Sequence, residues 1–560
     1  MKERYKKPYI EEIGTPREAW FHCAGAEKEP VFPYLVMDGG AFLFMNDRLG
    51  IQNGDQLLEK VMDGSFFTLW QKDGHFDWDV VFGLPAQDTM RNFEWHIFLQ
   101  RLYILLPLAT AYKRTGERRY AQKYIELFKD WMQKHPYEAF DASISYFATG
   151  FYWRDMQVAW RTIVLAFSLF FLDGAFEKED WLYLYAALQL HADHLYQEAE
   201  AHIQKGDAQN HVLQVGTALL YAGCLFGEFP NAQQYIEFGK NIVKQNLDKA
   251  IFADGGSDED SPSYSHFIAR LYLDAHVLLE NNGYESIPGL KESIAAQYEL
   301  LYQFSTKDNK TLQINDSYTM DVGHDLEIVQ EIMPMDFIKR KESRLFPESC
   351  LAVLRNENYE IFIDAMPLWA WHQHAGRPNI VAYYKNRPIL VDSGACNYDD
   401  RNLRDEYLIS AKAHNAVSCE ELGVHSCANV KDGYRITRFE TGDPQRVEVE
   451  GTFACGEVCF ALKRTVVLYR DRFTVEDEAW AEKEYSFYNV MHLAPGRFTQ
   501  TENGLIQQHG ERLLYVKCGP EKEVQLLPCI TQQNCIGVSP AVFVKNRGNR
   551  IKTFFEFQMQ

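Results

Sequence analysis

The sequence lacks the features that would direct it to a membrane or to nucleic acid. No long apolar run follows the basic stretch MKERYKKPYIEEIG at its start, which argues against a signal peptide and a transmembrane helix. Lys and Arg number only 57 against 78 Asp and Glu, a formal net charge of −21. Because phosphate backbones are bound by basic fields, we expect no nucleic acid and no membrane among the partners. We expect a cytoplasmic protein, or a secreted or periplasmic one if a leader has been trimmed away.

The cysteines are not arranged in any familiar pattern. There are 11, and no two form a CxxC pair, which excludes a zinc ribbon and a thioredoxin motif. Reduced and mostly buried thiols are the expected state. Aromatic residues are plentiful at 14%, which fits either a large core or a glycan-binding cleft. The negative net charge does not exclude an anionic substrate, because a few Arg and His focused in a cleft can reverse the local potential.

The first half of the chain has the periodicity of helices. An apolar face recurs over 120–131, and Gly116 is placed to end the helix before it. Further helices are predicted over the ranges 153–173, 179–203, 211–226, 231–249, 264–282 and 288–304. Consecutive helices that are apolar on two faces suit a toroid, and the absence of an exact repeat argues against a regular solenoid.

The period changes to that of strands after about residue 345. Apolar and polar residues alternate in YEIFIDAM, and the segments RVEVEGTF, YSFYNVMHL, RLLYVKC and IKTFFEFQM continue the pattern. Many strands without helices between them predict an antiparallel sandwich. The polar, irregular stretch between 305 and 345 marks the boundary. We therefore predict a helical domain over 1–340 and a β-sandwich over 341–560.

Two polar clusters fall at predicted helix starts. Asn210 and His211 lie where a polar segment turns into an apolar helix, a place also typical of a helix cap. In FADGGSDEDSPSYSHF, Ser261-Pro262 starts a helix and puts Tyr264 in its first turn, with Glu259 close by. A capping loop with an ordinary tyrosine is the alternative interpretation.

A third cluster contains potential metal ligands. His372 and His374 are two residues apart, which on a strand puts them on one face. Asp392 ends the segment RPILVD, which is predicted to form the neighbouring strand. His414 is predicted to begin a further strand. Two histidines and a carboxylate on adjacent strands predict a zinc or manganese site. The alternative is a chance pair of surface histidines.

Taken in order, these motifs resemble the heparinase II/III-like polysaccharide lyases. The resemblance rests on FDWD, on the helical run from WHIFLQRLY to ELFKDWM, on WRDMQVAWR, on the Asn-His pair, on DGGSDEDSPSY and on the series H-x-H, VDSG and AHN. It implies an incomplete (α/α) toroid followed by an antiparallel β-sandwich. It also implies β-elimination on glycosaminoglycans of the heparan sulfate, chondroitin sulfate or hyaluronan type, with 4,5-unsaturated products. The expected partner is an anionic polysaccharide or oligosaccharide, and the oligomeric state is left open.

The resemblance also implies roles for individual residues. Asn210 matches the residue that hydrogen-bonds the uronate carboxylate and stabilises the enolate-like intermediate. His211 or His372 matches the histidine that neutralises the carboxylate or acts as base. Tyr264 matches the proton donor to the leaving oxygen and is a further candidate base.

By the same resemblance, His374, Asp392 and His414 match the ligands of a mainly structural divalent metal, with zinc favoured over manganese. The residues expected to contact substrate are Trp95, Trp153, Arg154, Arg161, Tyr398 and Arg404. The arginines fit because a guanidinium can hold a carboxylate or sulfate with two hydrogen bonds.

The sequence departs from the family pattern at two positions and leaves other functions open. Gly376 stands where an acidic residue usually follows H-x-H, and Tyr264 is followed by Ser265-His266 rather than directly by histidine. An oligoalginate lyase with the same machinery is the nearest alternative. A glycoside hydrolase would need a second carboxylate motif beside Glu259 and Asp260. A glycan-binding protein without activity is the third possibility.

Overall fold

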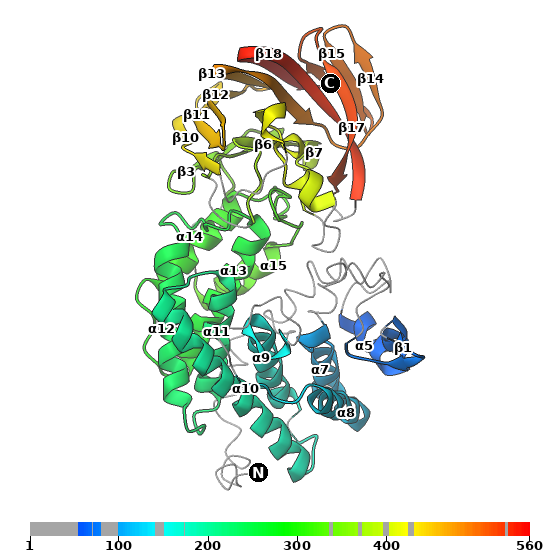
Figure 1. Ribbon diagram of the computed structural model, residues 1–560, viewed down its shortest axis with the longest axis vertical. Coiled ribbons are helices and arrows are strands. Elements are labelled where there is room, and N and C mark those ends of the chain that lie inside the picture. The colour runs from blue at the N-terminus through cyan, green and yellow to red at the C-terminus, as the bar shows by residue number, and fades with distance from the viewer. Residues whose placement is uncertain are drawn as a thin grey trace. The chain divides into compact units, whose positions relative to one another are not determined.

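The computed structural model describes residues 54–69, 71–79, 99–139, 151–172, 174–334, 340–367, 372–395, 403–423, 430–531 and 536–560 (Figure 1). Contacts between residues divide the chain into two compact units, each described here by itself. The helical unit comprises Met1–Ile251, Phe267–Ile294 and Ile328–Met333. The sheet unit comprises Phe252–His266, Ala295–Glu327 and Pro334–Gln560. No helix in the described ranges is long and apolar enough to span a membrane.

Close-packed helices form the helical unit. The described α-helices that lie wholly in this unit are α5 (Gly54–Asp63), α7 (Leu105–Thr115), α8 (Arg118–Lys134), α9 (Asp155–Phe171), α10 (Lys178–Lys205), α11 (Asn210–Leu225) and α12 (Ala232–Ala250), and a short hairpin of β1 (Gln71–Lys72) and β2 (His75–Phe76) follows α5. Helix α11 packs against α9, α10 and α12 (Figure 1). Glycines make its approach to α12 close, because a Cβ on Gly216 would lie 2.6 Å from the Ile242 side chain. The predicted stop at Gly116 is confirmed, with φ of +71° at the end of α7.

Three further helices have residues in both units. They are α13 (Pro262–Asn281), α14 (Leu290–Gln303) and α15 (Gly323–Ile332). The division by contacts therefore assigns the segments 252–266 and 295–327 to the sheet unit, whereas the sequence pattern predicts a boundary at 340/341. Tyr264 lies in the first turn of α13, as the Ser-Pro start predicted.

Two antiparallel sheets form the rest of the sheet unit. The smaller sheet has the order β3 (Arg344–Phe346), β4 (Leu351–Arg355), β5 (Tyr359–Asp364), β6 (Asn379–Tyr384) and β7 (Arg387–Leu390). The main path of the larger sheet runs β10 (Arg435–Glu440), β11 (Gln445–Cys455), β12 (Val458–Leu468), β13 (Arg472–His492), β18 (Ile536–Met559), β16 (Arg512–Lys517), β15 (Gly504–His509) and β14 (Phe498–Thr501). Beside this path, β8 (Val417–Cys419) pairs with β13, β9 (Val430–Asp432) with β11, and β17 (Glu523–Ile530) with β18.

One apolar core joins the two sheets. Ile361 and Ile363 of β5 share a cluster with Val447, Phe473 and Phe557 of the larger sheet. Alternating residues of β5 point to the other face, where Phe362 packs in a second cluster with residues of β3, β4 and β6 and with the segment 300–314. The predicted fold class, helices followed by an antiparallel sandwich, is confirmed.

The expected strand positions of three histidines were wrong. His414 lies in a bend before β8 rather than at its start. His372 and His374 do not lie on a strand but in an irregular segment that precedes β6. Gly376 and Pro378 follow them, and a proline cannot donate to a strand ladder. The backbone there finds other partners: His374 donates its N–H to the side chain of Asn315 at 3.2 Å.

Candidate functional site

A tight loop leads into the first turn of α13 and positions Tyr264. Its turn requires glycine at Gly255, which has φ of +90° and whose Cβ would lie 2.2 Å from the carbonyl oxygen of Ala296. Asp254 fixes the loop to the sheet unit by accepting hydrogen bonds from the backbone N–H groups of Glu348 and Ser349 at 2.8 and 2.9 Å. The DGG motif is therefore a structural support for the helix start.

Tyr264 and His372 meet face to face. Their ring centroids are 3.7 Å apart with an interplanar angle of 23°. Each nitrogen of His372 faces a carboxylate: Nε2 lies 3.3 Å from Oε2 of Glu259, and Nδ1 lies 3.2 Å from Oδ2 of Asp316. The structure thus brings together two of the predicted catalytic residues and fixes the ring between two acids.

Asp316 is the centre of this cluster. It is 2% exposed, and besides His372 it binds Nε2 of His374 at 2.9 Å and the guanidinium of Arg404 at 2.8 Å. Burial alone would raise its pKa, but Arg404 and the hydrogen bonds from the two histidines outweigh burial and hold the pKa well below the usual range. Asp316 is therefore held as an anion that contacts one predicted catalytic residue, one predicted metal ligand and one predicted substrate residue, namely His372, His374 and Arg404.

A buried arginine supports the cluster from behind. Arg377, almost fully buried, pairs with Asp260 and Asp364 and donates to Oδ1 of Asn315 at 2.9 Å. Asp260 and Asn315 both have left-handed backbones, with φ of +46° and +56°, a conformation that Asp and Asn tolerate better than most residues. This network joins the loop before α13 to strand β5 and to the segment that carries Asp316.

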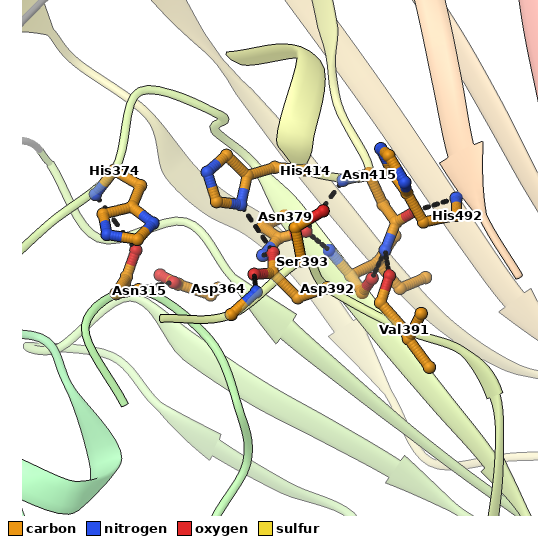
Figure 2. A network of polar contacts seen from close by, with 12 residues as sticks. Asn315, Asp364, His374, Asn379, Val391, Asp392, Ser393, His414, Asn415 and His492 are labelled. Carbon is orange, nitrogen blue, oxygen red and sulfur yellow. Dashed lines mark hydrogen bonds and ion pairs between the residues drawn. The ribbon is translucent and has the colours of Figure 1, made fainter. Parts of the chain in front are cut away.

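The predicted metal ligands lie next to one another (Figure 2). The rings of His374 and His414 have centroids 5.1 Å apart. Asp392 accepts hydrogen bonds from Nδ1 of His414 at 2.6 Å, from Asn379 at 2.6 Å and from the N–H of Gly394 at 2.7 Å. Burial would raise the pKa of Asp392, but His414 and the backbone donor outweigh burial and lower it. Asp392 is thus anchored as an anion.

The remaining nitrogens of the two histidines bear on metal binding. Nδ1 of His374 and Nε2 of His414 are buried and have no hydrogen-bond partner in the described ranges. Each ring gives its other nitrogen to a carboxylate, an arrangement that metal-binding histidines commonly show. In the part of the chain that the structure describes, however, no three side chains converge as a ligand group. The two histidine nitrogens are donors of a type that zinc prefers. Asp392 is hydrogen-bonded to His414.

Packing explains the glycine that departs from the family pattern. A Cβ on Gly376 would lie 2.2 Å from Cβ and 2.6 Å from Cγ of His414. An acidic side chain has no room at this position. Orientation of the histidines comes instead from Asp316 and Asp392.

The helical unit holds the other predicted residues that are described. Asn210 begins α11 and is buried, and its Oδ1 accepts from Gln214 at 3.3 Å, while His211 follows it in the helix. Trp153 is 2% exposed, and Arg154 is also buried. Arg161 is fully buried and donates to the carbonyl oxygens of Gln100 and Tyr152. The substrate roles of Trp153, Arg154 and Arg161 stay predictions, and the burial of Arg161 favours a structural role. Trp95 and Tyr398 lie outside the described residues.

Sequence reasoning missed the role of Asp316 and left Glu259 without one. Asp316 lies in INDSYTM, within the irregular boundary stretch that matches neither period. The available signal was an acidic residue directly after TLQIN, in which the apolar Leu312 and Ile314 alternate with polar residues. A charged side chain is almost never fully buried unless it is paired, so an acidic residue next to an apolar segment indicates a partner elsewhere in the chain.

Comparison with known proteins gives concordant results along the chain. The model of the heparinase II/III N-terminus matches residues 51–339, and the model of the heparinase II/III-like C-terminal region matches 338–527. The heparin-sulfate lyase of Pedobacter heparinus is 26% identical over 258 residues, 44% of this chain and 36% of the relative. That of Bacteroides thetaiotaomicron is 24% identical over 429 residues, 68% of this chain and 58% of the relative. The aligned stretches thus cover less than two thirds of these relatives.

Solved structures share the fold over nearly the whole chain. A crystal structure of heparinase III has a TM-score of 0.72 at 18% identity and covers 99% of this chain and 94% of its own. The heparan sulfate lyase of Pedobacter heparinus has a TM-score of 0.61 at 17% identity and covers 98% of this chain and 87% of its own. At these identities the likeness shows the fold alone.

Proposed function

The chain belongs to the heparinase II/III family, and we propose that it is a polysaccharide lyase that cleaves uronic-acid-containing glycosaminoglycans by β-elimination. The observation that carries the proposal is the stacked pair Tyr264 and His372, held between Glu259 and Asp316. A pure binding protein has no need of a phenol stacked on an imidazole that two carboxylates fix in place.

The arrangement fits the chemistry of elimination. The reaction removes the proton on C5 of the uronate, breaks the C4–O4 bond and protonates the departing O4. Tyr264 is the proposed proton carrier, since its hydroxyl lies on a ring that is stacked on His372. His372 has a carboxylate at each nitrogen, so both nitrogens are already engaged and its proposed role is to position the ring of Tyr264 rather than to accept the C5 proton. The proposed role of Asn210 is to donate a hydrogen bond to the uronate carboxylate, with His211 beside it.

Heparan sulfate is the proposed substrate. Its support is that the relatives named above are heparin-sulfate and heparan sulfate lyases. Arg404 is 17% exposed and pairs with Asp316. Its guanidinium is the proposed contact for the anionic groups of the chain. An oligoalginate lyase is the alternative, because alginate is also a polyuronate.

Ultraviolet absorbance during incubation with a panel of glycans tests this proposal. The panel contains heparan sulfate, heparin, chondroitin sulfate, hyaluronan, alginate and their oligosaccharides. The expected result is a rise from the conjugated C4–C5 double bond, largest with heparan sulfate. A rise with alginate alone would assign the alternative. New reducing ends without absorbance would indicate hydrolysis, and a flat trace with unchanged chain lengths would contradict catalysis.

We also propose that His374 and His414 hold a divalent metal, zinc in the first place, while Asp392 orients His414. Their two unpartnered buried nitrogens support this assignment. The ion would hold together the segments that carry the histidines, one of which includes His372. His374→Ala should lower both the bound metal in elemental analysis and the thermal midpoint. Unchanged metal content would show that this ligand set is wrong.

A further inference from the structure

A pocket lies within the sheet unit, and none of the described residues that contact Asp316 lines it. Its volume is about 260 Å³. Strands β6 and β7, the segment after β13, and the ends of β15 and β17 contribute to its wall. Tyr264, Glu259, Asp316 and His372 do not line it. The pocket is slightly smaller than the about 300–1,000 Å³ of sites for drug-sized ligands, so a molecule the size of one sugar residue suits it.

An arginine without an acidic partner lines this pocket. The side chain of Arg387, at the start of β7, is exposed and has no hydrogen bond or ion pair with a described residue, whereas the more buried Arg377, Arg404 and Arg464 are each paired with aspartate. A Cβ on Gly510 would lie 2.6 Å from Nη1 of Arg387, so the guanidinium lies against the turn between β15 and β16. An uncompensated guanidinium beside a cavity favours an anionic ligand.

A second polar group in the wall is also available for binding. Nε2 of His509 is buried and has no hydrogen-bond partner in the described part of the chain. Burial and the nearby Arg387 lower the pKa of His509 and so favour its neutral form. The one carboxylate in the wall, Asp392, already accepts three hydrogen bonds and offers little capacity to a ligand.

The rest of the wall is largely apolar. Tyr383, Pro388, Pro495 and Ile530 provide aromatic and aliphatic surfaces. Pockets that bind small molecules combine such surfaces with a few polar groups that orient the ligand. The faces of a sugar ring are rich in C–H groups, and a carboxylate or sulfate on the ring would reach the guanidinium.

We propose that this pocket binds one anionic sugar residue, with its carboxylate or sulfate on Arg387, as a holding site separate from the residues that cleave. The choice of a sugar as ligand rests on the proposed function. An anchor of this kind keeps a long chain attached between cleavage events and leaves the chemistry at Tyr264 unchanged.

Binding to the full-length protein tests the pocket directly and does not depend on cleavage. Ligand-observed saturation-transfer NMR would be run with two probes, glucuronate for a carboxylate and glucosamine 6-sulfate for a sulfate. The variants are Arg387→Gln, Arg387→Lys and a control, Arg435→Gln, which changes an exposed arginine on β10 outside the pocket. We expect Arg387→Gln to weaken binding of at least one probe by about tenfold or more, since it removes a charge-assisted hydrogen bond. Arg387→Lys should retain part of the binding and Arg435→Gln all of it.

Kinetics separates this proposal from the proposed function. On a polymeric substrate Arg387→Gln should raise KM several-fold and leave kcat unchanged, while on a tetrasaccharide both should stay at the wild-type value. Equal probe binding by wild type and Arg387→Gln would overturn the proposed sugar site. The absence of probe binding to wild type would overturn it as well. A wild-type protein that binds the probes through Arg387 but cleaves no glycan would instead contradict the proposed lyase activity.

Discussion

Asp316→Asn is the substitution that most sharply tests the organisation of the site. It keeps the shape of the side chain and removes its charge. Asp316 binds His372, His374 and Arg404 at 3.2, 2.9 and 2.8 Å, and its side chain is 2% exposed. Asparagine retains one acceptor oxygen and turns an amide N–H₂ toward groups that are themselves donors.

The expected loss of stability follows from these contacts. Hydrogen bonds to charged groups contribute about 1.5–3 kcal/mol each, and removing one partner of a buried ion pair costs about 3–5 kcal/mol. Because the three contacts are coupled, their contributions do not add. We expect Asp316→Asn to lower the free energy of unfolding by about 3–5 kcal/mol and the rate of cleavage by about 100-fold or more.

Asp321→Asn is the matched control. Asp321 belongs to the same segment, but its side chain is 56% exposed and pairs with Lys310. Exposed ion pairs contribute about 0–1 kcal/mol, so this variant should resemble wild type. Urea unfolding followed by circular dichroism and the absorbance assay would be run on both proteins. Similar losses in the two variants would refute the assignment of Asp316 as the centre of the site.

Three further changes probe the neighbourhood of the cluster. Glu259→Gln removes the carboxylate that faces Nε2 of His372 and should reduce kcat by about 10- to 100-fold with little change in KM; an unaltered kcat would remove Glu259 from the mechanism. Burial and the adjacent Glu259 raise the pKa of Asp258 to about 7. Between about pH 4 and about pH 7 the folded state keeps a proton on Asp258 that the unfolded state has lost. The contribution of Asp258 to the free energy of unfolding is therefore largest below about pH 4 and is lost as the pH rises to about 7. Asp258→Asn should flatten that part of the stability–pH curve, and an unchanged slope would contradict the shift. Gly376→Ala should destabilise the protein by about 1–3 kcal/mol and displace His414, because its Cβ has no room; wild-type thermal unfolding would rule out that contact.

The helical half of the fold was predictable because its signals are local. Apolar residues recur at helical spacing, and Gly116 and Ser261-Pro262 mark ends and starts, so the ranges read from the sequence agree closely with α9 to α14. The same holds for Tyr264, whose place in a first helical turn follows from the residues just before it.

The arrangement of the site was less accessible, since it depends on contacts between distant segments. Asp316 lies 56 residues from His372 and 88 from Arg404 along the chain, and nothing in the local pattern of INDSYTM indicates that these side chains meet. The spacing of His372 and His374, taken alone, predicts a strand. Their binding to Asp316, rather than a pleated backbone, directs them to one place.

The central claim is that Tyr264, stacked on His372, carries out β-elimination. The most direct measurement is the ultraviolet absorbance produced from heparan sulfate by wild type and by Tyr264→Phe, which removes only the hydroxyl. The account predicts a steady rise for wild type and a rate lower by about 10²–10⁴-fold for the variant, with unchanged circular dichroism and thermal midpoint. A variant that retains most of the activity would contradict the claim, and so would a wild-type protein that shortens the chain without forming the double bond.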